Sequence, residues 1–337
     1  MRVLLTGGAG YIGSHVAVVL ADAGHGVAIV DDLSGVSAVA LDRIREVARQ
    51  DIPFLQADIR DEDTLLRFVE GTGPFDAIVH LAGAKSVAES VADPLRYYDV
   101  NVGGAVSLIR VARQAGIAQI VFSSSATVYS DGAPMPVSED AATGLDQASP
   151  YGTSKRIVEK LLADVARADT ALRTVSLRYF NPVGAHPSGR IGEDPLGEAQ
   201  NLMPVVARAA TRGGAVSVYG VDYPTPDGTA QRDYVHVMDL AHAHLAAIEH
   251  APQGSTTYNI GTGTPVSVLE LVDAFERASG RSIPRTDAPR RPGDLPVSFA
   301  DPSKARRELG WVATRTIDEA CIDYWRWQQA NPAGYRS

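Results

Sequence analysis

The first thirteen residues constrain the fold of this chain more than any other stretch. Arg2 to Thr6 form an apolar run typical of a buried strand, which passes directly into Gly7-Gly8-Ala9-Gly10-Tyr11-Ile12-Gly13. The apolar-periodic segment Val16 to Leu20 follows and predicts a helix. The glycines match G-x-G-x-x-G from Gly8 or G-x-x-G-x-x-G from Gly7, and both registers place bare N–H groups at a helix N-terminus, where a pyrophosphate is attracted. By itself, the motif also fits a purely structural turn.

A carboxylate at the end of the next strand favours a dinucleotide site. The helix is expected to stop near Gly24, a second strand covers Gly26 to Val30, and Asp31 ends it eighteen positions after Gly13. A carboxylate at that place binds a ribose 2′-hydroxyl and repels a 2′-phosphate, so we expect NAD rather than NADP. The alternative is a solvated aspartate at a strand end.

Two further strands fit the same half-sheet, at Pro53 to Ala57 and at Phe75 to Leu81. Asp58 and Ile59 follow the first strand, where an adenine would be flanked. The second strand contains His80, which we interpret as a core histidine, and runs into small residues that let a cofactor approach the backbone. The pattern predicts an α/β chain with a Rossmann-type doubly wound parallel sheet.

A helix is expected over Pro94 to Gln114, and it carries Asn101. Its amide is either a buried group that anchors the helix or a part of the site, and the sequence leaves both possibilities open.

Hydroxyl and amino groups gather after the next expected strand, Ala118 to Phe122. The run Ser123 to Tyr129 places serine and threonine hydroxyls at the carboxyl end of this strand, where such sheets bind ligands. Further along, Tyr151 and Lys155 are four residues apart behind Pro150, so a helix places them on one face. An adjacent cation favours the phenolate, and such a pair can take a proton from a sugar hydroxyl. A lone tyrosine and lysine at this spacing are more often an ordinary helix face.

Composition narrows the possible partners. The net charge of −9 argues against nucleic-acid or anionic-membrane partners, which require a basic field. No stretch has the length and apolarity needed to cross a bilayer, and the single cysteine, Cys321, suits a reducing compartment, so we expect a cytoplasmic protein. No metal site is expected, because His242 and His244 are two apart on a helix and diverge.

Several blocks of sequence carry a resemblance to a known family. They are Thr6 to His15, Ser123 to Tyr129, Tyr151 to Lys155, Arg178 to Gly189, Glu193 to Pro195, Asn201 to Pro204, Asp222 to Thr225, Asp227 to Thr229, Arg232 to Leu240 and Gly293 to Pro296. Together they resemble the extended short-chain dehydrogenase/reductases and, specifically, the UDP-glucose 4-epimerases. The later blocks are the more specific ones, and the resemblance covers almost the whole chain.

The resemblance implies a mechanism based on a tightly bound NAD. Tyr151 would remove the proton of the sugar 4-hydroxyl while the C4 hydride passes to the nicotinamide, and the 4-keto sugar would turn over and take the hydride back on its other face. Lys155 would keep Tyr151 anionic and hold the nicotinamide ribose, while Ser125 and Thr127 would bind the shifting oxygen. The expected cofactor-binding residues are Gly7, Gly10, Tyr11, Ile12, Gly13, Asp31, Asp32, Asp58, Ile59, Leu81, Ala82, Gly83, Lys85, Asn101, Ser123, Tyr151, Lys155 and Tyr179.

The resemblance also implies a site for a UDP-hexose substrate. Arginines suit the diphosphate, amides suit anionic and sugar oxygens, and an aromatic ring suits the uracil. The expected residues are Lys85, Ser125, Tyr151, Asn181, Asn201, Leu202, Tyr219, Arg232, Arg291, Asp294 and Ser298. In many bacterial relatives a tyrosine stands where this chain has Ser298. The smaller residue leaves room for an acetamido group, so we expect UDP-N-acetylglucosamine to be accepted alongside UDP-glucose.

Residues 1–180, with returning segments at about 235–260, are expected to form the NAD-binding domain, and residues 181–337 a smaller α/β lobe that binds the UDP-sugar. Relatives pair as homodimers through helices that correspond to residues 99–114 and 152–166 of this chain.

Two alternatives remain open. One is another NAD-dependent nucleotide-sugar enzyme, such as a dehydratase or decarboxylase; dehydration needs an Asp-Glu pair after the active-site threonine, whereas Val128 and Tyr129 follow Thr127. The other is a non-catalytic regulator that senses NAD.

Overall fold

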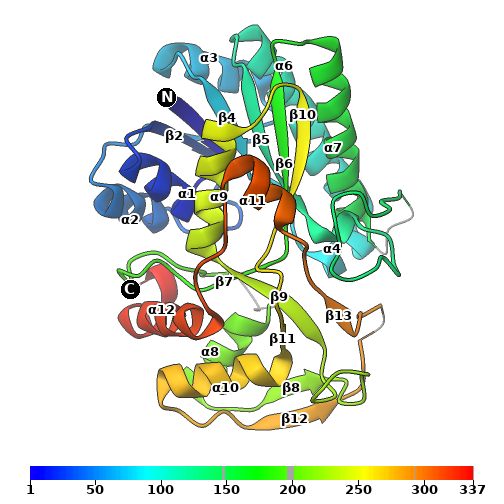
Figure 1. Ribbon diagram of the computed structural model, residues 1–337. Coiled ribbons are helices and arrows are strands. Elements are labelled where there is room, and N and C mark those ends of the chain that lie inside the picture. Colours follow the sequence, from blue (N-terminus) through cyan, green and yellow to red (C-terminus); the bar gives the residue numbers. More distant parts are fainter. Residues whose placement is uncertain (146–148, 196–200, 292, 337) are drawn as a thin grey trace.

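The large sheet of the protein is a seven-stranded parallel sheet in the order β10-β6-β5-β4-β1-β2-β3 (Figure 1). The computed structural model describes residues 1–145, 149–195, 201–291 and 293–336. The strands of this sheet are β1 (Arg2–Thr6), β2 (Gly26–Asp31), β3 (Phe54–Gln56), β4 (Ala77–His80), β5 (Gln119–Ser125), β6 (Arg173–Tyr179) and β10 (Ser255–Ile260). The predicted Rossmann-type fold is confirmed, because the strand order reverses direction from β1 to β4 as in doubly wound sheets.

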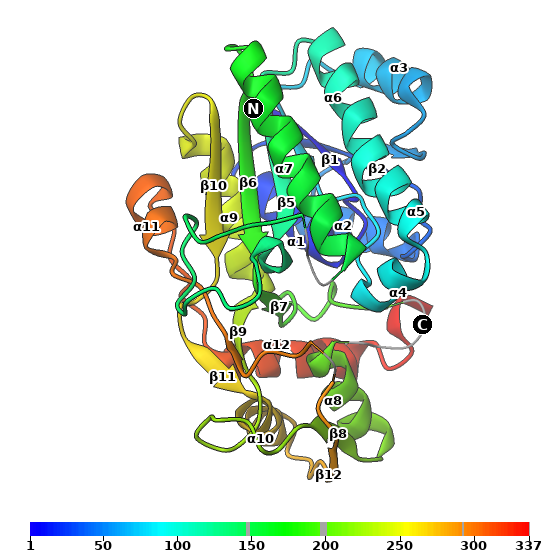
Figure 2. The ribbon, with the colours of Figure 1, turned by 90° about the vertical axis from the view of Figure 1, so that its right-hand side faces the viewer.

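Helices cover both faces of this sheet (Figures 1 and 2). They are α1 (Tyr11–Asp22), α2 (Val39–Ala48) and α9 (Val237–His250) on one face, and α3 (Glu62–Thr72), α6 (Gly104–Gln114) and α7 (Pro150–Ala168) on the other. Successive residues of β1 alternate between the two hydrophobic cores, since Val3 and Leu5 belong to the core under α1 and Leu4 to the core under α6. A strand covered on both faces therefore reads as an unbroken apolar run.

A smaller body lies beyond the carboxyl ends of the parallel strands (Figure 1). Its elements are β7 (Asn181–Val183), α8 (Leu202–Arg212), β8 (Val216–Tyr219), β9 (Gln231–His236), β11 (Pro265–Ser267), α10 (Val268–Ser279), β12 (Arg285–Ala288), β13 (Val297–Ser298) and α12 (Ile317–Ala330). Strand β9 pairs with β7, β11 and β13, and β8 pairs with β12. Its core is built around Phe275 and Trp327, which are almost fully buried.

The chain crosses between the two bodies more than once. After β9, helix α9 packs against α1, and β10 then pairs with β6 at the edge of the large sheet. Helix α11 (Ser303–Leu309) packs on α9 and β10 before the chain returns to α12. Each crossing passes the edge of the large sheet at which its strands end.

Two elements differ from the expected ones. Strand β5 continues through the serine run to Ser125, because Ser123 and Ser124 are buried and pair with Leu177 and Arg178 of β6. The expected helix over Pro94–Gln114 is divided into α5 (Pro94–Tyr97), a π-helical turn η1 (Tyr98–Gly103) and α6. Together with α4 (Val87–Ala92), α5 packs on α7.

Candidate active site

The glycine segment forms a tight cradle at the N-terminus of α1. Gly7 has a φ of +73°, and a Cβ atom there would lie 2.5 Å from the backbone nitrogen of Ala82. A Cβ on Gly13 would lie 2.3 Å from the carbonyl oxygen of Gly7. Gly10 is the N-cap of α1 and offers no side-chain cap, so the first N–H groups of the helix remain available to a ligand. These features fit the pyrophosphate of a dinucleotide.

Asp31 lies beside this cradle at the end of β2. It is 8% exposed, and its carboxylate accepts hydrogen bonds from the backbone N–H groups of Ala9 (3.0 Å) and Leu33 (2.9 Å). Burial raises the pKa of Asp31, while the two N–H donors oppose that rise. The expected ribose-binding carboxylate is therefore held against the glycine segment.

Further residues expected to bind the cofactor are on the neighbouring loops, with Asp58 and Ile59 those expected beside the adenine. Asp32 accepts a hydrogen bond from the N–H of Ser34 at 2.9 Å. Asp58 pairs with Arg60, and that hydrogen bond lowers the pKa of the Asp58 carboxyl. Ile59 packs where Gly104 lacks a side chain, because a Cβ on Gly104 would lie 2.7 Å from Ile59 Cδ1.

Lys155 is buried in α7 and points at the end of β5. Its Nζ donates to the carbonyl oxygen of Ser123 at 2.8 Å and lies 4.9 Å from the centroid of the Phe122 ring. The ring of Tyr151, one turn earlier, has its centroid 5.8 Å from the same Nζ. Burial lowers the pKa of Lys155 to about 8, so the ammonium is charged at neutral pH. The predicted pairing of tyrosine and lysine on one helix face is present.

Tyr151 joins a row of hydroxyl groups. It hydrogen-bonds Ser125, whose Oγ accepts a hydrogen bond from Thr127 Oγ1 at 3.0 Å. Burial raises the pKa of Tyr151, and the hydrogen bond with Ser125 opposes the rise. Burial of the phenol therefore outweighs that hydrogen bond in the protein alone, and the expected role of Lys155 in keeping Tyr151 anionic stays a prediction.

Asn101 holds the loop after β4 in place. Its Oδ1 accepts from the Ala84 N–H at 2.8 Å, and its Nδ2 donates to the Ala84 carbonyl at 3.1 Å and to Ser154 Oγ at 2.9 Å. A Cβ on the preceding Gly83 would lie 2.8 Å from Asn101 Oδ1 and 3.9 Å from Lys155 Nζ. The amide groups of Asn101 are thus engaged in holding the loop after β4 against α7, which favours the anchoring interpretation.

Other residues expected to bind the cofactor lie at the ends of the neighbouring strands. The Leu81 N–H donates to the Thr6 carbonyl at 2.9 Å, which joins the ends of β4 and β1. Tyr179 ends β6, and its hydroxyl bonds Nε2 of His244. The Nδ1 of His244 is occupied by the carbonyl of Leu240. Within the described ranges, no group of three or more histidine, cysteine or acidic side chains is arranged to hold a metal ion.

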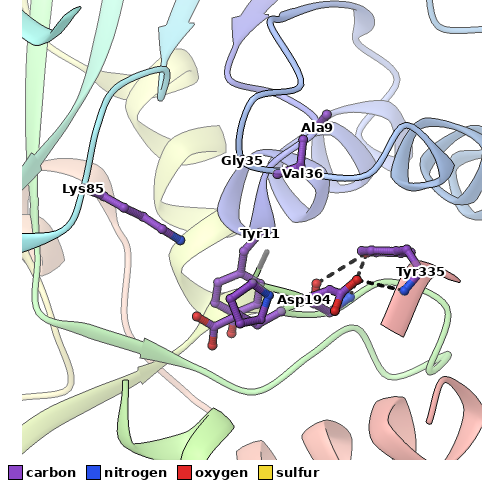
Figure 3. A pocket seen from close by; sticks show the side chains of 10 residues that line it. Ala9, Tyr11, Gly35, Val36, Lys85, Asp194 and Tyr335 are labelled. Carbon is purple, nitrogen blue, oxygen red and sulfur yellow. Dashed lines mark hydrogen bonds between the residues drawn. The ribbon is translucent and has the colours of Figure 1, made fainter. Parts of the chain in front are cut away.

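A pocket opens between the glycine segment and the smaller body (Figure 3). Tyr11 and Lys85 extend into it from the large body, and Asp194 and Tyr335 border it on the other side. The hydroxyl of Tyr11 donates to the Gly184 carbonyl at 2.6 Å, which ties α1 to the smaller body, whereas Ile12 packs against the core under α1. The pocket therefore joins the expected cofactor and substrate regions.

Glu193 also lines this pocket, although the sequence patterns did not predict it as a site residue. It is 7% exposed, burial raises the pKa of its carboxyl, and its Oε1 accepts from Asn201 Nδ2 at 3.2 Å. The signal was present in the block Glu193 to Pro195, which carried part of the resemblance.

The charged and aromatic residues that are expected to bind the substrate belong to the smaller body. Arg232 forms an ion pair with Asp294 and donates to the Leu295 carbonyl at 2.8 Å. The guanidinium of Arg291 lies 3.9 Å from the centroid of the Tyr219 ring. Such an arginine and aromatic pair suits a planar base beside a charged group.

The remaining expected substrate residues are Asn181 and Ser298, which lie beside strand β9, and Asn201 and Leu202, at the start of α8. Asn181 Nδ2 donates to the carbonyl of Asp233 at 3.1 Å, and Ser298 of β13 pairs with Arg232 of β9. Asn201 precedes α8, which begins at Leu202, and its side chain does not cap that helix. The side-chain amide of Asn201 instead donates to Glu193 Oε1 at 3.2 Å.

Comparisons with known proteins agree with this arrangement. The family model of the NAD dependent epimerase/dehydratase family matches residues 3–261. The UDP-glucose 4-epimerase of Bacillus subtilis (strain 168) is 49% identical over 340 residues, covering 100% of this chain and 99% of the relative.

Solved structures give the same result. The UDP-glucose 4-epimerase of Bifidobacterium longum, in complex with NAD⁺ and UDP, has a TM-score of 0.94 and 46% identity, covering 99% of this chain and 100% of that one. The UDP-Glc/GlcNAc 4-epimerase of Campylobacter jejuni has a TM-score of 0.84 and 34% identity, covering 98% and 99%. The resemblance to the UDP-glucose 4-epimerases is confirmed, and the chain belongs to the NAD dependent epimerase/dehydratase family.

Proposed function

We propose that this chain is an isomerase that inverts C4 of UDP-hexoses reversibly, with NAD bound throughout the cycle. The observation that carries the proposal is the meeting of Tyr151, Ser125 and Lys155 at the carboxyl edge of a sheet that also holds a glycine cradle. Arg232 and Arg291, which belong to the smaller body, supply the charge that a diphosphate needs.

In this proposal each side chain acts on a defined atom. Tyr151 takes the proton of the sugar 4-hydroxyl and returns it in the reverse step, while Ser125 and Thr127 hold the same oxygen through the 4-keto stage. NAD supplies the hydride acceptor and donor at C4. Lys155 provides a positive charge below about pH 8, which favours the phenolate form that Tyr151 must have before it accepts the proton. Because proton and hydride both return to the sugar, no other reactant is consumed.

The direct test is interconversion of UDP-galactose and UDP-glucose by the purified protein without added cofactor. Replacing Tyr151 by Phe removes the proton acceptor, and we expect turnover to fall by about 100-fold or more. Tyr97→Phe is the matched control, because the Tyr97 ring lies 6.5 Å from that of Tyr151 and its hydroxyl donates to Glu89. Normal turnover by Tyr151→Phe would refute the mechanism.

We further propose that N-acetylated UDP-hexoses are accepted. Ser298 is a small, partly buried residue in register with Arg232, so an acetamido group meets little side-chain bulk there. The Campylobacter jejuni neighbour is described as a UDP-Glc/GlcNAc 4-epimerase. We expect Ser298→Tyr to abolish turnover of UDP-N-acetylglucosamine while retaining that of UDP-glucose. Unchanged discrimination between the two sugars would exclude this role for Ser298.

The proposed division of labour assigns the cofactor to residues 1–180 with 235–260, and the sugar nucleotide to residues 181–337. We also propose a homodimer formed through the helices at 99–114 and 152–166. The exposed side chains of Val91 (61%) and Leu95 (80%), on α4 and α5 beside α7, support an apolar contact there. The mass in solution, measured by light scattering, tests this, and a monomer mass would refute it.

A cytoplasmic location is proposed from the composition and is tested by cell fractionation. In the described part of the chain, no helix combines the length and the apolarity required to cross a membrane. The dehydratase alternative lacks its carboxylates, since Val128 and Tyr129 follow Thr127.

A further inference from the structure

Helix α7 carries a third polar residue on the face that holds the tyrosine and the lysine. Glu159 follows Lys155 by four positions and Tyr151 by eight, so the three side chains lie along one side of the helix. Glu159 is 5% exposed, and the proposed reaction gives it no part. A buried carboxylate requires partners, because burying a charge without them is costly.

The partners of Glu159 come from both neighbouring strands and from α7 itself, where Arg156 Nη1 lies 3.7 Å from Glu159 Oε2. Ser124 Oγ of β5 donates to Glu159 Oε1 at 2.6 Å. Arg178 of β6 donates through Nε to Oε1 at 2.9 Å and through Nη2 to Oε2 at 2.8 Å. Arg178 is itself 5% exposed, so this is a buried bidentate pair. The carboxylate thus fastens α7 to β5 and β6, the strands that α7 crosses in Figure 2.

Three consecutive residues at the end of β5 are the hydrogen-bond partners of the three residues of α7. The carbonyl of Ser123 accepts from Lys155, and the hydroxyl of Ser124 donates to Glu159. Ser125, the next residue, hydrogen-bonds Tyr151. A change in the distance between α7 and β5 at Glu159 therefore also moves the phenol and the ammonium.

Arg178 also contacts the segment that follows Ser125 and Thr127. Its guanidinium lies 4.8 Å from the centroid of the Tyr129 ring, and its Nη1 donates to the Glu139 carbonyl at 3.2 Å. Tyr129 ends the 3₁₀ turn η2 (Ala126–Val128) that contains Thr127. One guanidinium therefore contacts both the carboxylate on α7 and the end of the turn that follows Ser125.

We propose that Glu159 and Arg178 are positioning residues, which hold Tyr151 of α7 at the correct distance from Ser125 and Thr127 for proton transfer. This inference rests on the proposed epimerase reaction. It differs from a purely structural role in one consequence: loss of the pair lowers kcat even in a variant that remains fully folded. The affinity for the UDP group should change little, because the residues proposed to bind it lie on the smaller body.

The first variant is Glu159→Gln, which keeps the shape of the side chain and removes the charge opposite Arg178. A displacement of about 1 Å can cost about 100-fold in rate. We therefore expect kcat to fall by about tenfold to 100-fold, with KM for UDP-galactose within about twofold and an unchanged amount of bound NAD. Normal kcat in a folded Glu159→Gln protein would refute the inference.

The double variant Glu159→Leu with Arg178→Met distinguishes an effect on the position of Tyr151 from an effect on the stability of the protein. Apolar side chains of similar volume often replace a buried ion pair without loss of stability. We expect this protein to melt near the wild-type temperature and still to show the lowered kcat. Recovery of wild-type kcat together with wild-type stability would show that the pair acts only on folding, and would overturn the inference.

Asp239→Asn is the matched control elsewhere in the fold. Asp239 is 3% exposed on α9 and pairs with Arg315, so its loss also disrupts a buried carboxylate and its donors. We expect Asp239→Asn to lower the melting temperature. At temperatures where this variant remains folded, we expect its kcat to be unchanged. If it lowers kcat as much as Glu159→Gln does, the effect is general and the inference fails. Inactivity of the wild type would instead refute the proposed function.

Discussion

Adding one methyl group to the glycine cradle should both destabilise the protein and release its cofactor. An alanine at Gly7 must adopt a φ of +73°, which costs roughly 1–2 kcal/mol for an L-residue. Its Cβ would also lie 2.5 Å from the nitrogen of Ala82 and 2.9 Å from the carbonyl carbon of Leu81. Both of these contacts are with backbone atoms, so no side-chain rotation relieves them.

The backbone at this point resists displacement. The N–H groups of Leu81 and Ala82 both donate to the Thr6 carbonyl at 2.9 Å, and the Gly7 N–H donates to the Val30 carbonyl at 2.8 Å. Separating the ends of β1 and β4 weakens the two bonds to Thr6, each worth about 1 kcal/mol net. We therefore expect Gly7→Ala to lower the free energy of unfolding by about 3–4 kcal/mol in total.

Gly24→Ala is the matched control for the cost of the positive φ alone. Gly24 has a φ of +81°, and nothing lies within 4 Å of a Cβ added there, so only the cost of about 1–2 kcal/mol applies. Unfolding in denaturant measures the two losses of stability. Releasing the bound nucleotide by heating the protein, and then measuring its absorbance, gives the amount of bound NAD. We expect Gly24→Ala to retain NAD and Gly7→Ala to lose it. Equal stability losses, or full NAD occupancy in Gly7→Ala, would refute the reasoning.

Three further outcomes follow from buried groups. Burial lowers the pKa of Lys155 from 10.5 to about 8, so between these pH values the unfolded chain binds the proton and the folded protein does not. The free energy of unfolding of the cofactor-free protein should therefore rise by about 3 kcal/mol from pH 8 to 10.5, relative to that of Lys155→Met. The gain is lost again as pH falls through about 8, and a constant difference would contradict it. Asp31→Asn should weaken retention of NAD and permit exchange with NADP, as measured by nucleotide release; unaltered selectivity would count against this role of Asp31. Burial raises the pKa of Cys321 to about 12, so a thiol reagent should label it only after unfolding, and rapid labelling of the folded protein would contradict this.

Local patterns in the sequence were sufficient for the large sheet and its ligand edge. The glycine segment, the aspartate at the end of β2 and the spacing of Tyr151 and Lys155 each lie within one strand, turn or helix. Such patterns follow from the periodicity of a single element and from the steric needs of one turn, so they can be read before any long-range contact is known.

Other properties depended on which elements meet in space. The rise in the pKa of Tyr151 comes from the burial of its ring, which the spacing to Lys155 does not reveal. The anchoring role of Asn101 required the position of Ala84, and the pairing of Glu159 with Arg178 required the register of β5, β6 and α7. These effects arise between residues far apart in the chain. Only the tertiary structure determines their distances and their loss of hydration, and therefore which groups share a charge or a hydrogen bond.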